Sequence, residues 1–286
     1  MKSLICIAIF LSGMVGFAQN SGEELIVMSF NIRYNNPDDG VNIWENRKEW
    51  AAKSIRFFEA DLVGAQEVTY PQLQDMEALL PTYAHIGVGR EGGNKGEFTP
   101  IFYKKDRFEL LEHSTFWLSE TPQDVGSKGW DAALPRILTW AKFKDKNGDR
   151  VFYFFNTHFD HKGTIARDKS AVLIAKEINR IAGEHATILT GDFNTPPGST
   201  PYTALIEYAL IDTASDLDEE KKFGTEYTTN GWDIEAGDER KRIDYVFYKG
   251  NQISPLSYHV LDGQRGARFI SDHFPLLVDF VFDTKD

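Results

Sequence analysis

The chain has 286 residues, with 31 Lys and Arg against 43 Asp and Glu, so its formal net charge is −12. This acidic balance excludes a protein that clamps nucleic acid non-specifically, because that affinity comes mostly from cations that neutralise phosphates. It leaves nucleic acid open as a substrate, since a bound metal ion can reverse the local charge of an acidic site.

The N-terminus has the composition of a secretory signal peptide. Lys2 is followed by an apolar run over residues 4–11 and then by small residues, which predicts a signal over residues 1–18 with cleavage after Ala18. The run is too short to span a bilayer, so we expect an exported protein, periplasmic or extracellular, without a membrane span. The only cysteine lies inside this segment, so the mature chain has neither a disulfide nor a thiol nucleophile. Residues 19–286 contain no linker or repeat, which predicts one domain, and we expect a monomer.

The first part of this domain alternates strands and helices. Apolar runs predict strands over residues 25–32 and 61–65, and amphipathic patterns predict helices over 45–59 and 71–80. This order is typical of an α/β fold built in layers.

More strands follow along the chain. Residues 83–89, 99–103 and 108–118 are expected to form a meander, and residues 136–143 and 151–159 a hairpin around Asn147-Gly148. The remaining predicted elements are helices over 165–181 and 202–210, a long surface loop over 214–239, and strands over 186–189, 243–248 and 276–282.

The motif Gly-Asp-Phe-Asn at residues 191–194 comes directly after the buried strand 186–189. It places a carboxylate, Asp192, and a carboxamide, Asn194, at the C-terminal edge of a strand, where ligands bind in open α/β sheets. Asp192 can accept a proton or bind a metal, and Asn194 can orient a phosphate or a water. The alternative is a plain Asx-turn that only shapes the loop.

Similar polar residues lie at or near the ends of other predicted strands. The full set is Asn31, Glu67, His158, Asp192, Asn194, Asp244, Asp272 and His273. Each alone has a structural explanation, such as a turn cap or an ion pair between Asp244 and Arg242. Their joint occurrence at strand ends indicates an active site.

The residue types in this set suit hydrolysis of a phosphate ester with one or two hard cations. Glu67 and Asp272 offer carboxylate oxygens, which Mg²⁺ or Mn²⁺ prefers. His158 and His273 can stabilise phosphate oxygens or transfer protons near neutral pH. The sequence has no His-Glu-x-x-His motif, no Walker A loop and no Gly-x-Ser-x-Gly elbow.

Six motifs in order give the chain a specific resemblance. They are Ser-Phe-Asn-Ile at 29–32, Gln-Glu at 66–67, Asn-Thr-His at 156–158, Gly-Asp-Phe-Asn at 191–194, Ile-Asp-Tyr at 243–245 and Ser-Asp-His at 271–273. Together they resemble the endonuclease/exonuclease/phosphatase superfamily, which includes pancreatic deoxyribonuclease and, nearest in motif, the deadenylase-type exonucleases. The resemblance implies a four-layer α/β sandwich, in which two packed mixed sheets are flanked by helices and the site lies at one edge.

The resemblance also implies a role for each residue. Glu67 is expected to be the chief metal ligand, with Asn31 and Asp272 close to the metal. The expected catalytic roles are Asp192 as general base, Asn194 positioning the phosphate or the water, Asp244 orienting His273, and His158 contacting the scissile phosphate. Whether Asp192 or His273 takes the proton stays open at this point.

The substrate is less well defined than the chemistry. Candidates for contacting the substrate phosphate are Arg33, Arg136, His161 and Arg167. The motif set favours a phosphodiesterase acting on nucleic acid. The alternatives are a phosphatase or phospholipase C-type hydrolase of inositol or sugar phosphates or sphingomyelin-like lipids, and a catalytically silent binding domain. We expect loops 35–44, 87–98, 119–136 and 214–240 to select the substrate.

Overall fold

A computed structural model describes residues 24–235 and 240–283. The expected signal segment, residues 1–18, lies outside the described residues. Among the helices in these ranges, none is both long enough and apolar enough to cross a membrane.

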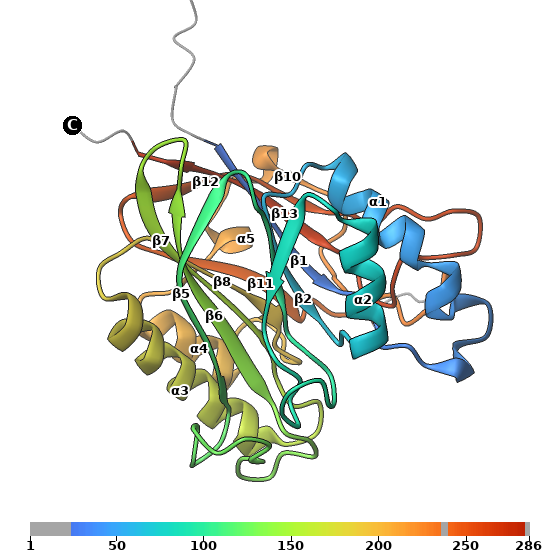
Figure 1. The fold of residues 1–286 in the computed structure, drawn as a ribbon, viewed down its shortest axis with the longest axis horizontal. Helices are drawn as coiled ribbons and strands as arrows, with labels where there is room; N and C mark the ends of the chain where they lie inside the picture. Colours follow the sequence, from blue (N-terminus) through green and yellow to red (C-terminus); the bar gives the residue numbers. More distant parts are fainter. Residues whose placement is uncertain (1–23, 236–239, 284–286) are drawn as a thin grey trace, which may run out of the picture.

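Two β-sheets form the centre of the molecule (Figure 1). The first sheet has the strand order β10 (Lys222–Phe223), β12 (Ile253–Val260), β13 (Leu276–Phe282), β1 (Glu24–Asn31), β2 (Leu62–Gln66), β4 (Ile101–Lys104) and β3 (Tyr83–Ile86). The second has the order β5 (Phe108–Trp117), β6 (Ile137–Asp145), β7 (Arg150–His158), β8 (Thr187–Asp192), β11 (Asp244–Lys249) and β9 (Ile211–Asp212).

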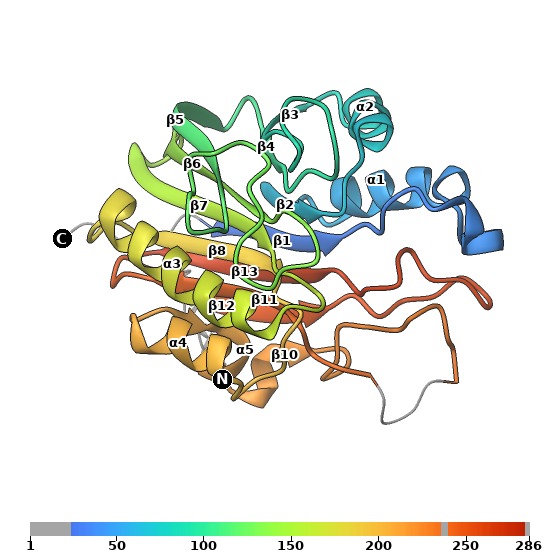
Figure 2. The ribbon, with the colours of Figure 1, turned by 90° about the horizontal axis from the view of Figure 1, so that it is seen from below.

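Helices cover the outer faces of both sheets (Figures 1 and 2). The described α-helices are α1 (Lys48–Phe57), α2 (Tyr70–Leu79), α3 (Thr164–Ala182), α4 (Thr200–Glu207) and α5 (Thr213–Asp216), with 3₁₀ turns at Pro37–Asn42, Trp44–Asn46 and Glu219–Lys221. Apolar side chains of α1 and α2 pack with those of β1 and β2, and those of α3 and α4 pack with β7, β8 and β11. A third cluster joins the facing sides of the two sheets. The four-layer α/β sandwich is therefore confirmed.

Strand register brings the predicted strand ends together. β1 and β2 are parallel, with Asn31 opposite Gln66, and β7 and β8 are parallel, with His158 opposite Asp192. β11 runs antiparallel to β8, so its first residue, Asp244, is also opposite Asp192. The residues of the expected site thus collect at one end of both sheets.

A buried polar network joins the two sheets beneath this end. The Asn156 side chain of β7 accepts from Gln66 Nε2 at 2.7 Å and donates to the Ala65 carbonyl at 2.7 Å. Gly64 of β2 permits this approach, because a Cβ there would lie 2.0 Å from Thr190 Oγ1 and 2.7 Å from Asn156 Oδ1. The sheets therefore meet through hydrogen-bonded polar groups as well as apolar packing.

Two sequence expectations about the elements were wrong, and one strand was not predicted. β3 and β4 pair in the first sheet, whereas β5 pairs with β6 in the second, so these three strands form no meander. β12 was missed, because Pro255 and a register shift beside it interrupt the strand pattern. The expected loop over 214–239 contains α5, a 3₁₀ turn and β10. Asp212 accepts a hydrogen bond from Ala214 N and begins α5, a local capping signal within an otherwise aperiodic stretch.

Candidate active site

Asn31 links two acidic side chains that come from different sheets. Its Nδ2 donates to Glu67 Oε1 at 3.0 Å and to Asp192 Oδ2 at 3.0 Å. Asn31 is buried at the end of β1, and its own Oδ1 accepts from the backbone N of Arg33. Both carboxylates are thereby oriented toward one point.

The backbone turns sharply where the strands end. Arg33, Glu67 and Asn194 have φ angles of 59°, 62° and 48°, in the left-handed region that residues other than glycine rarely adopt. The Glu67 side chain reaches the segment that follows β1, where its Oε2 accepts from Tyr34 N at 3.0 Å. Such conformations collect at functional sites, where the surrounding structure holds them.

Two histidines flank Asp192. His273 Nδ1 lies 2.8 Å from Asp244 Oδ2, and His273 Nε2 lies 3.9 Å from Asp192 Oδ2. On the other side, His158 Nε2 lies 3.4 Å from Asp192 Oδ2 and 3.2 Å from Asn194 Nδ2. The predicted contact between Asp244 and His273 is thus present, and Asp192 lies between the two imidazoles.

The surroundings leave the His158 imidazole neutral and the His273 imidazole positively charged. Burial lowers the pKa of His158 well below its usual value, and the nearby Arg136 and Arg90 lower it further. Burial opposes the charged form of His273 too, but Asp244 and Asp192 outweigh it and raise its pKa well above the usual value. Burial, together with the charge of Asp244, raises the pKa of Asp192 to about 7. The site therefore combines a neutral imidazole, a cationic one and a carboxyl that can exchange a proton near neutral pH.

The acidic groups have a geometry that suits a metal ion. Glu67, His158 and Asp192 each offer one ligand atom, and these atoms lie within 4.8 Å of one another. Asp192, Asp244 and His273 form a second such group among the described residues. The sequence-predicted ligand Asp272 lies nearby and contacts Arg33 Nη1 through Oδ2 at 3.5 Å. Carboxylate oxygens with a neutral imidazole fit a divalent cation.

A cleft of about 510 Å³ opens onto these residues. Its lining includes three of the predicted phosphate contacts, Arg33, Arg136 and His161. Arg136 is buried, with its Nε 3.4 Å from Asp160 Oδ2 and its Nη2 3.1 Å from His161 Nδ1. The fourth predicted phosphate contact, Arg167, is not among the residues that line the cleft. It lies in the first turn of α3, where its Nη1 donates to the Asp160 carbonyl at 2.9 Å.

Two charged residues of the cleft were not predicted from the sequence. Arg90 and Glu97 line it together and form an ion pair with Nη1 and Oε2 2.7 Å apart. Both come from the loop 87–98 that we expected to border the site. Arg90 directly follows the predicted strand 83–89 and Glu97 lies two residues before the strand 99–103, but neither belongs to one of the six motifs, so neither was singled out.

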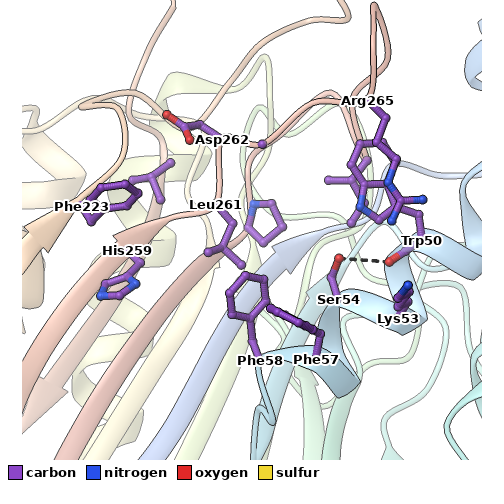
Figure 3. A pocket seen from close by; sticks show the side chains of 14 residues that line it. Trp50, Lys53, Ser54, Phe57, Phe58, Phe223, His259, Leu261, Asp262 and Arg265 are labelled. Atoms are coloured by element: carbon purple, nitrogen blue, oxygen red, sulfur yellow. Dashed lines mark hydrogen bonds between the residues drawn. The ribbon is translucent and has the colours of Figure 1, made fainter.

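A larger groove of about 680 Å³ lies elsewhere, between α1 and the segment after β12. Figure 3 shows Trp50 and Phe57 of α1, with Phe58 directly after the helix, facing Leu261. Arg265 lies over the Trp50 ring, with its Cζ 4.3 Å from the ring centroid. The groove contains none of the motif residues, so the catalytic groups belong to the smaller, polar cleft.

Comparison with known proteins agrees with this geometry. Residues 28–273 match the model of the endonuclease/exonuclease/phosphatase family. The crystal structure of an endonuclease/exonuclease/phosphatase from Bacteroides vulgatus is 40% identical, with a TM-score of 0.87 over 91% of this chain and 100% of that chain.

Two further relatives extend the comparison. A mannosyl-6-phosphatase from Bacteroides thetaiotaomicron is 39% identical, with a TM-score of 0.84 over 90% of this chain and 100% of that one. Nocturnin of Drosophila melanogaster is 24% identical over 97% of this chain but only 50% of that protein, so the chain spans half of its length. The chain therefore belongs to the endonuclease/exonuclease/phosphatase family of metal-dependent phosphoester hydrolases.

Proposed function

We propose that the protein is an exported phosphatase that hydrolyses a small phosphomonoester. The observation that carries the proposal is the 510 Å³ cleft, in which Arg33, Arg136 and His161 share the lining with the Glu67 and Asp192 carboxylates. A cleft of this volume suits a small ligand. A terminal phosphate carries up to two negative charges, which cations on one side and a metal ion on the other can neutralise together. The likeness to a mannosyl-6-phosphatase supports a sugar phosphate.

Glu67, with the Asp272 carboxylate near it, would hold the metal ion, for which Mg²⁺ or Mn²⁺ fits the oxygen ligands best. When bound, this ion supplies positive charge that withdraws electrons from the phosphate and eases attack by water. Asn31 keeps the Glu67 and Asp192 carboxylates in place through its two hydrogen bonds.

The side chains around the phosphate have different roles in the reaction. Asp192 accepts a proton from the attacking water, because its raised pKa makes it an effective base near neutral pH. The water oxygen bonds to phosphorus as the phosphorus–oxygen bond to the leaving group breaks, and the leaving oxygen takes a proton from solvent water to become the alcohol. Asp244 keeps His273 protonated, so its Nε2–H stabilises a phosphate oxygen, and neutral His158 contacts another with Asn194. Arg33 and Arg136 bind the remaining phosphate charge.

The rival function is the phosphodiesterase acting on nucleic acid that the sequence motifs favoured. A lipid-headgroup diester belongs to the same class, and mycobacterial sphingomyelinases are 24% identical over 51% of this chain. The monoester fits better, because the cleft contains the Arg90–Glu97 pair. The phosphate next along a polynucleotide would meet the negative Glu97 side chain.

One experiment separates these functions. Purified protein with Mg²⁺ or Mn²⁺ is assayed on p-nitrophenyl phosphate, bis(p-nitrophenyl) phosphate and a hexose 6-phosphate, each with an EDTA control. We expect kcat/KM to be highest for a monoester and to vanish in EDTA. A higher kcat/KM for the diester rejects the phosphatase proposal, and no turnover on any substrate with metal present favours a binding domain.

A further inference from the structure

One wall of the cleft has no role in the chemistry described above. It is formed by the loop 87–98, where Arg90 and Glu97 point their charged groups at each other across 2.7 Å. The side chains are 10% and 18% exposed, so the pair is partly withdrawn from water but open to the cleft. Leu134 and Arg136 line the cleft beside it, and Arg136 belongs to the phosphate-binding group. The pair therefore shares the cleft with the phosphate-binding Arg136, within reach of a leaving alcohol.

Backbone contacts of the loop 87–98 fix the positions of Arg90 and Glu97. Arg90 N donates to the Glu97 carbonyl at 2.9 Å, and Trp117 Nε1 donates to the Arg90 carbonyl at 2.6 Å. Gly89 has no room for a Cβ, which would lie 2.0 Å from the Lys95 carbonyl oxygen. Gly96 has a φ of +73° and packs against the Arg90 stem. A loop closed this tightly fixes the orientation of both charged groups.

Arg90 and Glu97 have more donors and acceptors than their one direct hydrogen bond uses. A guanidinium has five N–H donors and a carboxylate about four acceptor positions. Here one direct bond joins them, and Arg90 Nε is buried without a partner among the described residues. A charged pair that lines the cleft and has donors and acceptors to spare can bind a further polar group. Burial also raises the pKa of Glu97, despite the opposing charge of Arg90.

We propose that Arg90 and Glu97 form a subsite for the hydroxyl groups of the leaving alcohol, so that the substrate is the phosphomonoester of a polyhydroxylated alcohol such as a hexose. This inference rests on the proposed phosphatase function. A hydroxyl group can donate to Glu97 and accept from Arg90 at once. An anion would be repelled by Glu97, and an apolar alcohol would leave both charged groups without new partners.

The test compares two substrates that share a phosphate but differ in hydroxyl groups, mannose 6-phosphate and p-nitrophenyl phosphate. The readout is the ratio of kcat/KM for the sugar phosphate to kcat/KM for the aryl phosphate. We expect Glu97→Gln and Arg90→Lys to lower this ratio about tenfold or more, because a site built to bind hydroxyl groups discriminates strongly through them. Glu91→Gln is the matched control, since Glu91 is exposed on the same loop and does not line the cleft. It should leave both constants unchanged.

A second measurement uses the wild-type protein, so it does not depend on the variants folding. Mannose 6-phosphate is compared with deoxy-hexose 6-phosphates that lack one hydroxyl each, and at least one should show a tenfold lower kcat/KM. The hydroxyl subsite is rejected if every deoxy analogue has the same kcat/KM as the parent sugar phosphate. It is also rejected if Glu97→Gln lowers kcat/KM equally for mannose 6-phosphate and p-nitrophenyl phosphate. If the wild-type protein cleaves only diesters, the phosphatase proposal itself fails and the subsite with it. Activity on p-nitrophenyl phosphate therefore distinguishes the two failures.

Discussion

His273 Nδ1 lies 2.8 Å from Asp244 Oδ2, although one residue precedes β13 of the first sheet and the other begins β11 of the second. The bond fixes the imidazole so that Nε2 faces Asp192, 3.9 Å from its Oδ2. It therefore joins the two sheets through a contact that also sets the charge of a catalytic group.

Replacing Asp244 by Asn should lower kcat by on the order of 10²–10³, because a carboxamide neither orients the imidazole nor stabilises its charged form. Steady-state kinetics on p-nitrophenyl phosphate measure the loss, and a melting curve checks the fold. Asp218→Asn, at an exposed site, is the control. A variant with wild-type kcat contradicts the role of the pair.

Metal dependence should be lost with Glu67. Glu67→Gln keeps the size of the side chain but removes the charge that attracts a cation, so we expect on the order of 10²–10³ lower activity at fixed Mg²⁺. Calorimetric titration of the variant with Mg²⁺ or Mn²⁺ should show weaker metal binding than in the wild-type protein. Equal activity in EDTA and in Mg²⁺ would falsify this prediction for the wild-type protein.

The arginines near the phosphate should differ in their effects. Arg33→Ala removes a charge-assisted hydrogen bond of about 1.5–3 kcal/mol, so KM should rise about 10- to 100-fold while metal binding persists. Arg136→Ala should raise KM and also lower the melting temperature, because it leaves the buried Asp160 without its cation. Arg167→Ala is the control and should not change KM, since Arg167 does not line the cleft. An unchanged KM in both of the first two variants contradicts their proposed role.

Asp160 should make stability depend on pH. Burial alone raises its pKa, but hydrogen bonds from the N–H groups of Gly163, Ala133 and Lys162, with the charge of Arg136, outweigh it and hold the pKa below its usual range. The stabilisation is therefore complete above the unfolded pKa of about 3.9 and is lost as the pH falls through the lower folded pKa.

Asp160→Asn should lower the free energy of unfolding at pH 7 by on the order of 1–3 kcal/mol, and the difference from wild type should narrow below about pH 4. Urea unfolding at several pH values measures this. If wild type and variant differ by the same free energy of unfolding at pH 3 and at pH 7, the prediction is contradicted.

Gly64→Ala should destabilise the protein by about 1–3 kcal/mol or more, because the added methyl group would overlap Thr190 Oγ1 and Asn156 Oδ1 between the sheets. Gly263→Ala is the matched control, since a Cβ there meets no atom within 4 Å. Urea unfolding of both variants compares them, and equal stability of the two would show that the sheets can separate without cost.

Local sequence patterns were enough to place most of the catalytic set. A buried strand followed by a polar residue and a turn is recognised from neighbouring residues, so Asn31, Glu67 and Asp192 could be assigned to strand ends from the sequence alone. Ends of parallel strands share one edge of a sheet, and this explains why such residues meet.

Tertiary structure decided what depends on partners far apart in the chain. The side chain of Arg167 donates to the Asp160 carbonyl, whereas Arg90 and Glu97 line the cleft from a loop in which no motif marks them. The sheet that β5 joins and the pairing of β12 follow from hydrogen bonds between distant strands. The residues of one segment cannot specify these choices, because the free energy that separates them comes from long-range packing and pairing.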